Sequence, residues 1–193
     1  MRPDLLLRTA CDVIAERGLA NTRVSDVAAA AGVSQALVFY HFETKERLLA
    51  EAYAYAARRD LDRLDAIAAS PEPAVEKIRR LLKWYAPGAS ARKWPMWIDC
   101  WAESVRVPEV ERVSRRLDLK WRETLAEVIT VGVKDGDFNC ADPSGAAWRI
   151  ITLLEGLAVQ TAVHPRLVPR RQAAEWIRLA AARELDLAPE ALA

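Results

Sequence analysis

The stretch AAAAGVSQALVFYHFETKERLL, residues 28–49, constrains the fold more than any other part of the chain. Alanines favour a helix up to Ala31, Gly32 permits the left-handed conformation that ends a helix, and Ser34 is a good helix N-cap. Only about two helical turns then fit before Thr44, which can cap another helix. The spacing predicts two helices joined by a three- or four-residue turn, which is a helix-turn-helix.

The residue types suit this geometry. Ala28 is small where the second helix must cross closely, and Val33 and Val38 can close the core of the pair. The short second helix can then present a bare outer face, as entry into a DNA major groove requires. An ordinary αα-hairpin in a helical protein has the same turn, so the turn alone leaves both interpretations open.

Apolar residues recur at helical intervals along the rest of the chain. No segment alternates convincingly with period two, and seven Gly among 193 residues are few. The sequence therefore predicts an all-α fold of about nine helices. The predicted helices cover residues 3–17, 22–31, 34–41, 44–69, 74–85, 94–105, 108–134, 142–164 and 169–185, and residues 86–90 form a loop.

Composition limits the class of protein. The chain is 52% hydrophobic and 28% charged, with a net charge of +1, which fits a globular protein and not one that coats nucleic acid or an anionic membrane. Cys11, Cys100 and Cys140 are widely spaced, as in a reducing compartment. The most apolar stretch, residues 150–163, has 14 residues and contains Glu155, too short and too polar to span a bilayer. We expect a cytoplasmic protein with no membrane partner.

Residues 6–49 resemble the DNA-binding domain of the TetR family of bacterial repressors. The resemblance implies a helix-turn-helix domain at residues 1–48 and a helical domain for effector binding and dimerisation at residues 49–193. The residues that carry it are Ala10, Gly18, Thr22-x-Val24-x-x-Val27-Ala28, Ala31-Gly32-Val33-Ser34, Val38-Phe39-Tyr40-His41-Phe42, Thr44-Lys45-Glu46 and Leu48. Residues 134–138 (KDGDF) and 153–157 (LLEGL) are more weakly similar to the subgroup of the choline-responsive repressor of betaine synthesis.

The resemblance implies DNA contacts on and around the short helix. Gln35 suits adenine, and Ala36 or Phe39 suits a thymine methyl group. His41 and Phe42 are expected to pack instead. The expected base-facing residues are Ser34, Gln35, Ala36 and Phe39, and the expected phosphate-facing residues are Thr22, Arg23, Tyr40, Thr44 and Lys45.

Residues 34–42 contain no Lys or Arg, and residues 1–50 hold six basic and six acidic side chains. We therefore expect weak non-specific binding and a modest salt dependence. Affinity would come from a homodimer on a palindromic operator in double-stranded DNA, whose half-sites lie about one helical turn or a multiple apart. The last two helices would form the dimer interface as a four-helix bundle. Its predicted residues are Trp148, Ile151, Leu154, Ala158, Thr161, Trp176, Ile177, Ala180 and Glu184.

Seven Trp residues all follow residue 83. They form either a Trp-rich core or dimer face, or the lining of an effector cavity, which the family resemblance supports. Glu155 lies in an apolar helix and needs a partner, which is either Arg122, Arg149 or a backbone N–H, or a cationic ligand. The alternative effector is a bulky hydrophobic or acyl compound. The candidate ligand-binding residues are Trp84, Trp94, Trp97, Asp99, Trp101, Glu103, Trp121 and Glu155.

No motif supports catalysis, a metal site or a cofactor. His41 and His164 are the only histidines, and neither lies in a metal-binding motif. The chain contains no Gly-rich phosphate loop, G-x-S-x-G or H-E-x-x-H. The sequence predicts a ligand-responsive DNA-binding regulator that represses and is released by a small molecule. The alternatives are an activator of the same fold, or a helical protein-interaction module without an effector.

Overall fold

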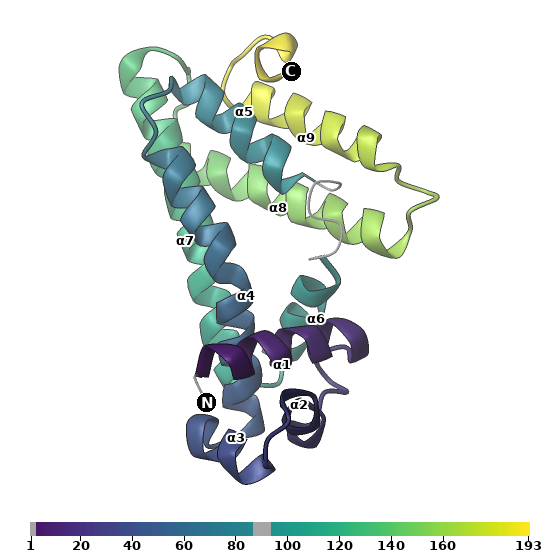
Figure 1. Cartoon of the computed structure of the whole chain (residues 1–193). Helices are drawn as coiled ribbons and strands as arrows, with labels where there is room; N and C mark the ends of the chain where they lie inside the picture. The colour runs from purple at the N-terminus through teal and green to yellow at the C-terminus, as the bar shows by residue number, and fades with distance from the viewer. Residues whose placement is uncertain (1–2, 87–93) are drawn as a thin grey trace. The chain divides into compact units, whose positions relative to one another are not determined.

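The computed structural model describes residues 3–86 and 94–193, and in these ranges the regular structure is entirely helical (Figure 1). The nine predicted α-helices are confirmed, with every end within two residues of the predicted one. The predicted loop at residues 86–90 lies outside the described residues, except for Ala86. The helices are α1 Pro3–Arg17, α2 Val24–Ala31, α3 Gln35–Phe42, α4 Lys45–Ala68, α5 Ala74–Tyr85, α6 Trp94–Ser104, α7 Pro108–Asp135, α8 Pro143–Val163 and α9 Arg170–Glu184, followed by the 3₁₀ helix η1 Pro189–Leu192.

Capping residues fix several of these ends. Ser34 accepts a hydrogen bond from the Leu37 N–H at 3.3 Å, and Thr44 accepts one from the Arg47 N–H at 3.1 Å. Asp142 accepts one from the Gly145 N–H at 2.9 Å at the start of α8. Each satisfies one of the unpaired N–H groups of a helix start, as the sequence predicted.

The chain divides into two compact units, residues 1–61 with 95–118 and residues 62–94 with 119–193. It passes between them within α4, at the start of α6 and within α7. The predicted domain boundary at residues 48 and 49 lies near the start of α4, and it stays a prediction. Figure 1 shows α1, α2 and α3 gathered around the first turns of α4 in the first unit. Its core is built from side chains that are at most 2% exposed, among them Leu6, Ile14, Leu19, Val27, Val38, Phe42, Leu48 and Tyr53.

In the second unit, α8 and α9 lie side by side, and η1 packs against α5 and α9 (Figure 1). The buried face of α8 includes Ile151, Leu154, Ala158 and Thr161, and Ile177 of α9 is 1% exposed. These side chains are already buried within one chain and are not free to contact a partner. Their assignment to the dimer interface was therefore wrong. The sequence also predicted no helix after residue 185, whereas η1 buries Leu192 to 4% exposure.

Helix α8 is 21 residues long, and by length and composition alone it could cross a membrane. It begins seven residues before the apolar stretch that the sequence suggested. The core helix of a globular protein passes the same test. Arg149 of α8 pairs with Glu184 of α9 at 2.7 Å, and Glu155 pairs with Arg122 of α7 at 3.0 Å. Packing and ion pairs thus bind this helix to the rest of its unit.

Candidate functional site

The turn between α2 and α3 has the geometry that the sequence predicted. Gly32 adopts φ 67° and ψ 35°, the left-handed conformation that costs a residue with a side chain about 1 kcal/mol or more. The N–H groups of Gly32 and Val33 donate to the carbonyls of Ala29 and Ala28, at 3.2 and 3.0 Å. These bonds close the end of α2 and direct the chain into α3 two residues later.

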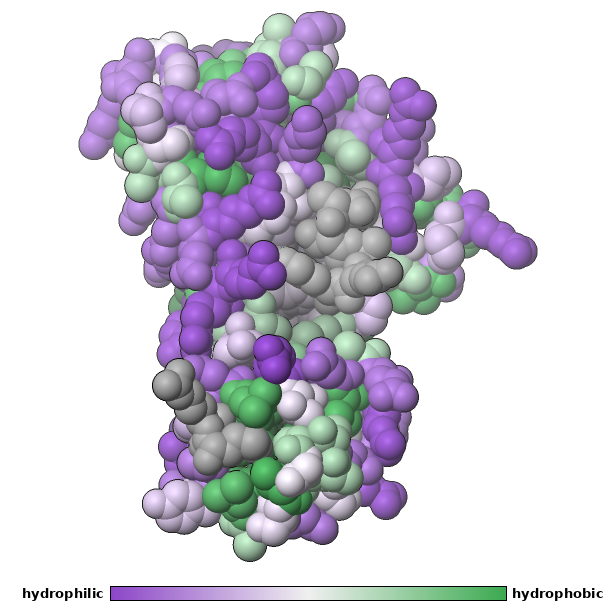
Figure 2. Space-filling model, viewed as in Figure 1, coloured by the Kyte–Doolittle hydropathy of each residue, from purple (hydrophilic) through white to green (hydrophobic). Residues whose placement is uncertain are grey.

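Helix α3 buries one narrow face and exposes the rest. Val38 and Phe42 are each 1% exposed and anchor the helix in the unit, whereas Phe39 is 43% and Tyr40 78% exposed. Apolar and near-neutral residues gather over α2 and α3 at the lower end of Figure 2, with few strongly hydrophilic ones among them. Large apolar side chains in contact with water are costly, so this exposed face indicates a binding surface.

Seven of the nine predicted DNA-contact residues have exposed side chains. Two differ. Lys45 is half-buried and its ammonium group donates to the Ala20 carbonyl at 3.4 Å. Thr22 is 1% exposed, and its hydroxyl donates to the Gly18 carbonyl at 2.8 Å. The exposed residues are Arg23, Ser34, Gln35, Ala36, Phe39, Tyr40 and Thr44.

Thr22 is also not the N-cap of α2, which corrects the predicted helix start. The cap is Arg23, whose N–H donates to Asp26 Oδ2 at 3.1 Å. The same Asp26 pairs with Arg17 at 3.0 Å. A carboxylate therefore already occupies the start of α2, where the helix dipole favours negative charge. The Arg23 side chain is exposed and remains available to an external anion.

Aromatic rings of three helices pack together in the second unit. The rings of Tyr85 and Trp121 stack with centroids 4.2 Å apart, Trp84 lies 5.3 Å from Trp121, and Trp94 lies 5.3 Å from Tyr85. Sequence reasoning missed Tyr85, although it follows Trp84 directly at the end of α5. The guanidinium of Arg63 lies 4.9 Å from the Trp84 ring centroid and covers one of its faces.

The Trp121 side chain lines a small apolar space. Trp121 is 6% exposed, and its Nε1 has no hydrogen-bond partner among the described residues. The neighbouring cavity has a volume of about 20 Å³, which holds at most a single water molecule. Its lining residues are Leu81, Leu82, Tyr85, Trp121, Leu125, Ile150, Ile151 and Leu154.

Glu155 has an internal partner, one of the two arginines that the sequence allowed. Its Oε2 lies 3.0 Å from Nη2 of Arg122, and the two side chains are 16% and 9% exposed. The Arg122 guanidinium also lies 4.2 Å from the ring centroid of Trp148, which is itself half-exposed. The Glu155 carboxylate is therefore neutralised within the protein.

The eight candidate ligand-binding residues divide between the two units. Trp84, Trp94, Trp121 and Glu155 belong to the second unit, and the other four belong to the first. In the first unit, Trp97 packs edge-on against Tyr53 at 5.1 Å between centroids. Asp99 accepts a hydrogen bond from the Leu19 N–H at 3.1 Å and so caps the turn after α1. The remaining two, Trp101 and Glu103, lie on the same helix, α6, and are half-buried.

The helical parts match known families along most of the chain. Residues 6–52 match "Bacterial regulatory proteins, tetR family", and residues 74–186 match "BetI-type transcriptional repressor, C-terminal". The HTH-type transcriptional regulator CymR of Pseudomonas putida is 25% identical over 156 residues, which cover 81% of this chain and 77% of CymR.

Solved structures of transcriptional regulators also share this fold. A putative transcriptional regulator from Saccharomonospora viridis, in complex with choline, is 30% identical, covers 90% of this chain and 91% of its own, and has a TM-score of 0.79. A putative transcriptional regulator from Pseudomonas aeruginosa PAO1 shares the fold at 21% identity and a TM-score of 0.81, covering 100% and 96% of the two chains. With a helix-turn-helix at one end and a BetI-type helical region at the other, this chain belongs to the TetR family of DNA-binding transcriptional regulators.

Proposed function

We propose that this regulator, a DNA-binding protein and not an enzyme, represses transcription in the cytoplasm as a homodimer on a palindromic operator and is released by a small molecule. The observation that carries the proposal is the exposed, uncharged face of α3 behind the Gly32 turn. Gln35 offers the amide that pairs with adenine, and Ala36 and Phe39 offer apolar contact to thymine methyl groups. Tyr40, Thr44, Arg23 and the ammonium group of Lys45 would hold phosphates and set the register.

Gel shifts on DNA from the region upstream of its own gene test this surface. Replacing Phe39 and Tyr40 with Ala should abolish a specific shift while the circular dichroism spectrum stays helical. Leu167→Ala is the matched control, because Leu167 is 78% exposed, like Tyr40, but lies in the other unit. An unchanged shift by the Phe39→Ala/Tyr40→Ala variant would reject the assignment of α3 as the recognition helix.

The dimer is proposed to form through the exposed face of α8. An open groove of about 580 Å³ lies along it, lined by Arg149, Thr152, Leu153, Gly156, Leu157 and Gln160. A side-chain carbon added at Gly156 would meet nothing within 4 Å in the single chain, so a partner helix has room to approach closely. Gly156→Arg should produce a folded monomer in sedimentation experiments. Val105→Arg, at a position that is 82% exposed in the first unit, should remain dimeric.

The effector is proposed to enter the aromatic cluster of Trp84, Tyr85, Trp94 and Trp121. A choline-like ammonium compound fits best, because ring faces attract quaternary ammonium groups and the 30%-identical Saccharomonospora viridis relative was solved with choline. A hydroxyl oxygen on such a ligand could accept the hydrogen bond that Trp121 Nε1 lacks among the described residues.

The cavity beside Trp121 is about 20 Å³, so an effector must separate α5, α7 and α8 as it enters. A ligand that binds only the opened state shifts the equilibrium by its difference in affinity for the two states. This supplies the proposed link between binding and operator release.

Titration of tryptophan fluorescence with choline, polyamines, neutral aromatics and an acyl-CoA tests the effector class. A saturable change with cations alone would support the ammonium proposal, and a response only to acyl or neutral compounds would reject it. Trp121→Phe keeps a ring but removes the N–H, and it should weaken choline binding about tenfold if that hydrogen bond forms. Trp148→Phe, at the half-exposed ring over Arg122, is the control.

A further inference from the structure

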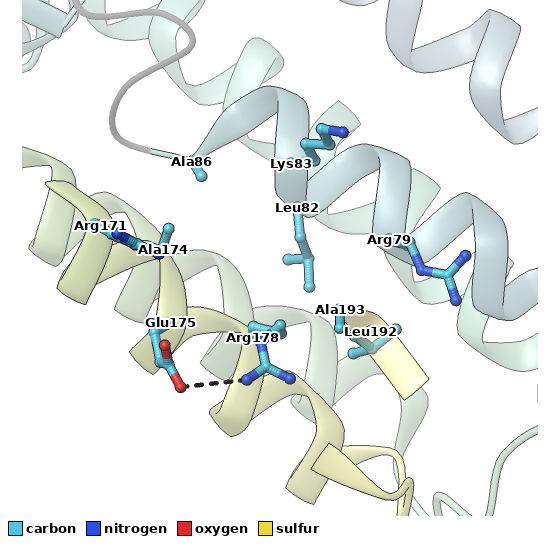
Figure 3. Close-up of a pocket in the computed structure, with 10 residues that line it drawn as sticks. All are labelled: Arg79, Leu82, Lys83, Ala86, Arg171, Ala174, Glu175, Arg178, Leu192 and Ala193. Atoms are coloured by element: carbon cyan, nitrogen blue, oxygen red, sulfur yellow. Dashed lines mark hydrogen bonds and ion pairs between the residues drawn. The ribbon is translucent and has the colours of Figure 1, made fainter. Parts of the chain in front are cut away.

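A second cavity lies within the second unit, in the groove between α5 and α9 (Figure 3). Its volume is about 320 Å³, within the range of small-molecule sites. Leu82 projects from α5 toward α9 in Figure 3. The lining residues are Arg79, Leu82, Lys83, Ala86, Arg171, Ala174, Glu175, Arg178, Leu192 and Ala193.

The floor of this groove is apolar, and neighbouring residues bury most of it. Leu82 and Leu192 are 8% and 4% exposed. Hydrogen bonds hold η1 across one end, since Arg79 Nη2 donates to the Ala191 carbonyl at 2.7 Å and Arg178 donates to the Pro189 carbonyl. Binding of an apolar ligand here would cost little conformational entropy of the protein, because the side chains of the site are already in place.

The rim is basic. Arg79 pairs with Glu76, and Arg178 pairs with Glu175 at 3.3 Å. Lys83 of α5 and Arg171 of α9 are exposed and form no ion pair or hydrogen bond with the described residues. The four basic side chains exceed the two carboxylates, Glu76 and Glu175, by two. This surplus of positive charge favours an anion, and the two carboxylates disfavour a polyanion such as a nucleotide.

We propose that the α5–α9 groove binds a small monocarboxylate with an apolar body, such as a medium-chain or aryl carboxylate. The carboxylate pairs with Arg171 of α9, and the body covers Leu82 and Leu192. The Lys83 side chain leaves α5 on the side away from α9 in Figure 3 and only adds to the positive charge of the rim. Guanidinium groups match carboxylates with two parallel hydrogen bonds, which selects this head group over a neutral one. Leu82 also lines the small cavity beside Trp121, so the ligand body lies one side chain away from the aromatic cluster. The site is independent of the proposed cationic effector.

Isothermal titration calorimetry of the full chain with sodium octanoate tests the proposal. Octanamide and octylammonium are the matched neutral and cationic probes. We expect octanoate to bind with a Kd below about 1 mM and octanamide to bind at least about tenfold more weakly. Equal binding of octanoate and octanamide, or no heat from octanoate at about 10 mM, would overturn the proposal.

Variants then locate the site. Arg171→Gln should weaken octanoate binding about tenfold, a modest loss because this cation is solvated. Arg170→Gln removes a charge one residue earlier in α9, outside the groove lining, and should bind as the parent does. Ala174→Phe fills the groove without changing its charge and should abolish binding, with circular dichroism confirming the fold. If Ala174→Phe binds octanoate normally, or if Arg171→Gln and Arg170→Gln behave alike, the anion is bound elsewhere and the assignment fails.

Discussion

Glu155 shows that the role of a buried charge depends on its neighbours. From the sequence alone it could form an internal ion pair or bind a cationic ligand. The sequence places it in an apolar helix and therefore requires a partner, but Arg122 lies 33 residues away and Arg149 only six. In the structure, Arg122 pairs with Glu155, and Arg149 instead pairs with Glu184. The choice depends on which face of α8 meets α7, and local periodicity does not specify that.

Replacing one partner of this pair should cost far more than replacing both. Glu155→Gln leaves the Arg122 guanidinium buried without its counter-ion, and we expect the free energy of unfolding to fall by about 3 kcal/mol. Arg122→Met/Glu155→Leu should lie within about 1 kcal/mol of the parent. Urea denaturation followed by circular dichroism measures both. A double variant as unstable as the sum of the two single variants would show that the residues do not act as a pair. Because Glu155→Gln is destabilising, Trp121→Phe is the cleaner probe of effector binding.

Cys11 makes stability depend on alkaline pH. Burial, with a smaller contribution from Asp12, raises the pKa of its thiol from 9.0 to about 11. In the unfolded chain the thiol ionises near pH 9, so unfolding gains free energy from ionisation between about pH 9 and 11. The contribution of Cys11 to stability is thus fully present below pH 9 and declines as the pH rises toward 11.

We expect the unfolding midpoint in urea to fall more steeply between about pH 8 and 10.5 for the parent than for Cys11→Ala. Lys and Tyr side chains titrate in the same range in both proteins, so the difference between the two curves isolates the thiol. Parallel pH profiles would mean that Cys11 ionises equally in the folded and unfolded states.

At the scale of the element, the helices were predictable because their signals are local. Apolar spacing, Pro at the starts of α7 and α8, and caps at Ser34, Thr44 and Asp142 each act within a few residues. The buried face of α8 was not predictable, because nearly the whole circumference of this helix is apolar or small. Which side packs inside depends on α9 and the rest of the unit. The short η1 and the groove it closes were missed for the same reason, since both depend on contacts distant in sequence.

Ser34 has two roles at the start of α3, a capping role and a proposed DNA contact, that substitution can separate. Its hydroxyl caps α3 through the Leu37 N–H, and its exposed side chain is a predicted DNA contact. Ser34→Ala should lower the free energy of unfolding by about 1 kcal/mol and weaken operator binding. Ser34→Asp keeps the cap and the stability but places a negative charge beside the DNA, so it should lose binding alone. Thermal unfolding and gel shifts measure the two effects. Equal stability of Ser34→Ala and the parent would remove the capping role.

At the scale of the whole molecule, the chain is nearly neutral, with 28 basic and 27 acidic side chains. Several basic side chains of the DNA-binding unit already form ion pairs within the protein. Arg17 pairs with Asp26 at 3.0 Å, and Arg47 pairs with Glu43 and Glu51 at 2.8 and 3.0 Å. Around α2 and α3, Arg23 and Lys45 are the basic side chains of residues 18–46, and neither forms an ion pair with the described residues. We therefore expect the duplex to meet about two available cations per protomer.

This sets the expected salt dependence of operator binding. A dimer that neutralises about four phosphates should show a slope of about −4 for log Kobs against log salt concentration. Lys45→Gln removes one cation from each protomer and should reduce the slope to about −2. Arg59→Gln is the control, because Arg59 is exposed on α4 fourteen residues further along and should leave the slope unchanged. Fluorescence anisotropy on a labelled operator at rising salt gives all three values. A parent slope near −8 would mean that paired arginines such as Arg17 and Arg47 exchange their carboxylate partners for phosphates. Operator specificity would then depend less on the uncharged face of α3 than proposed.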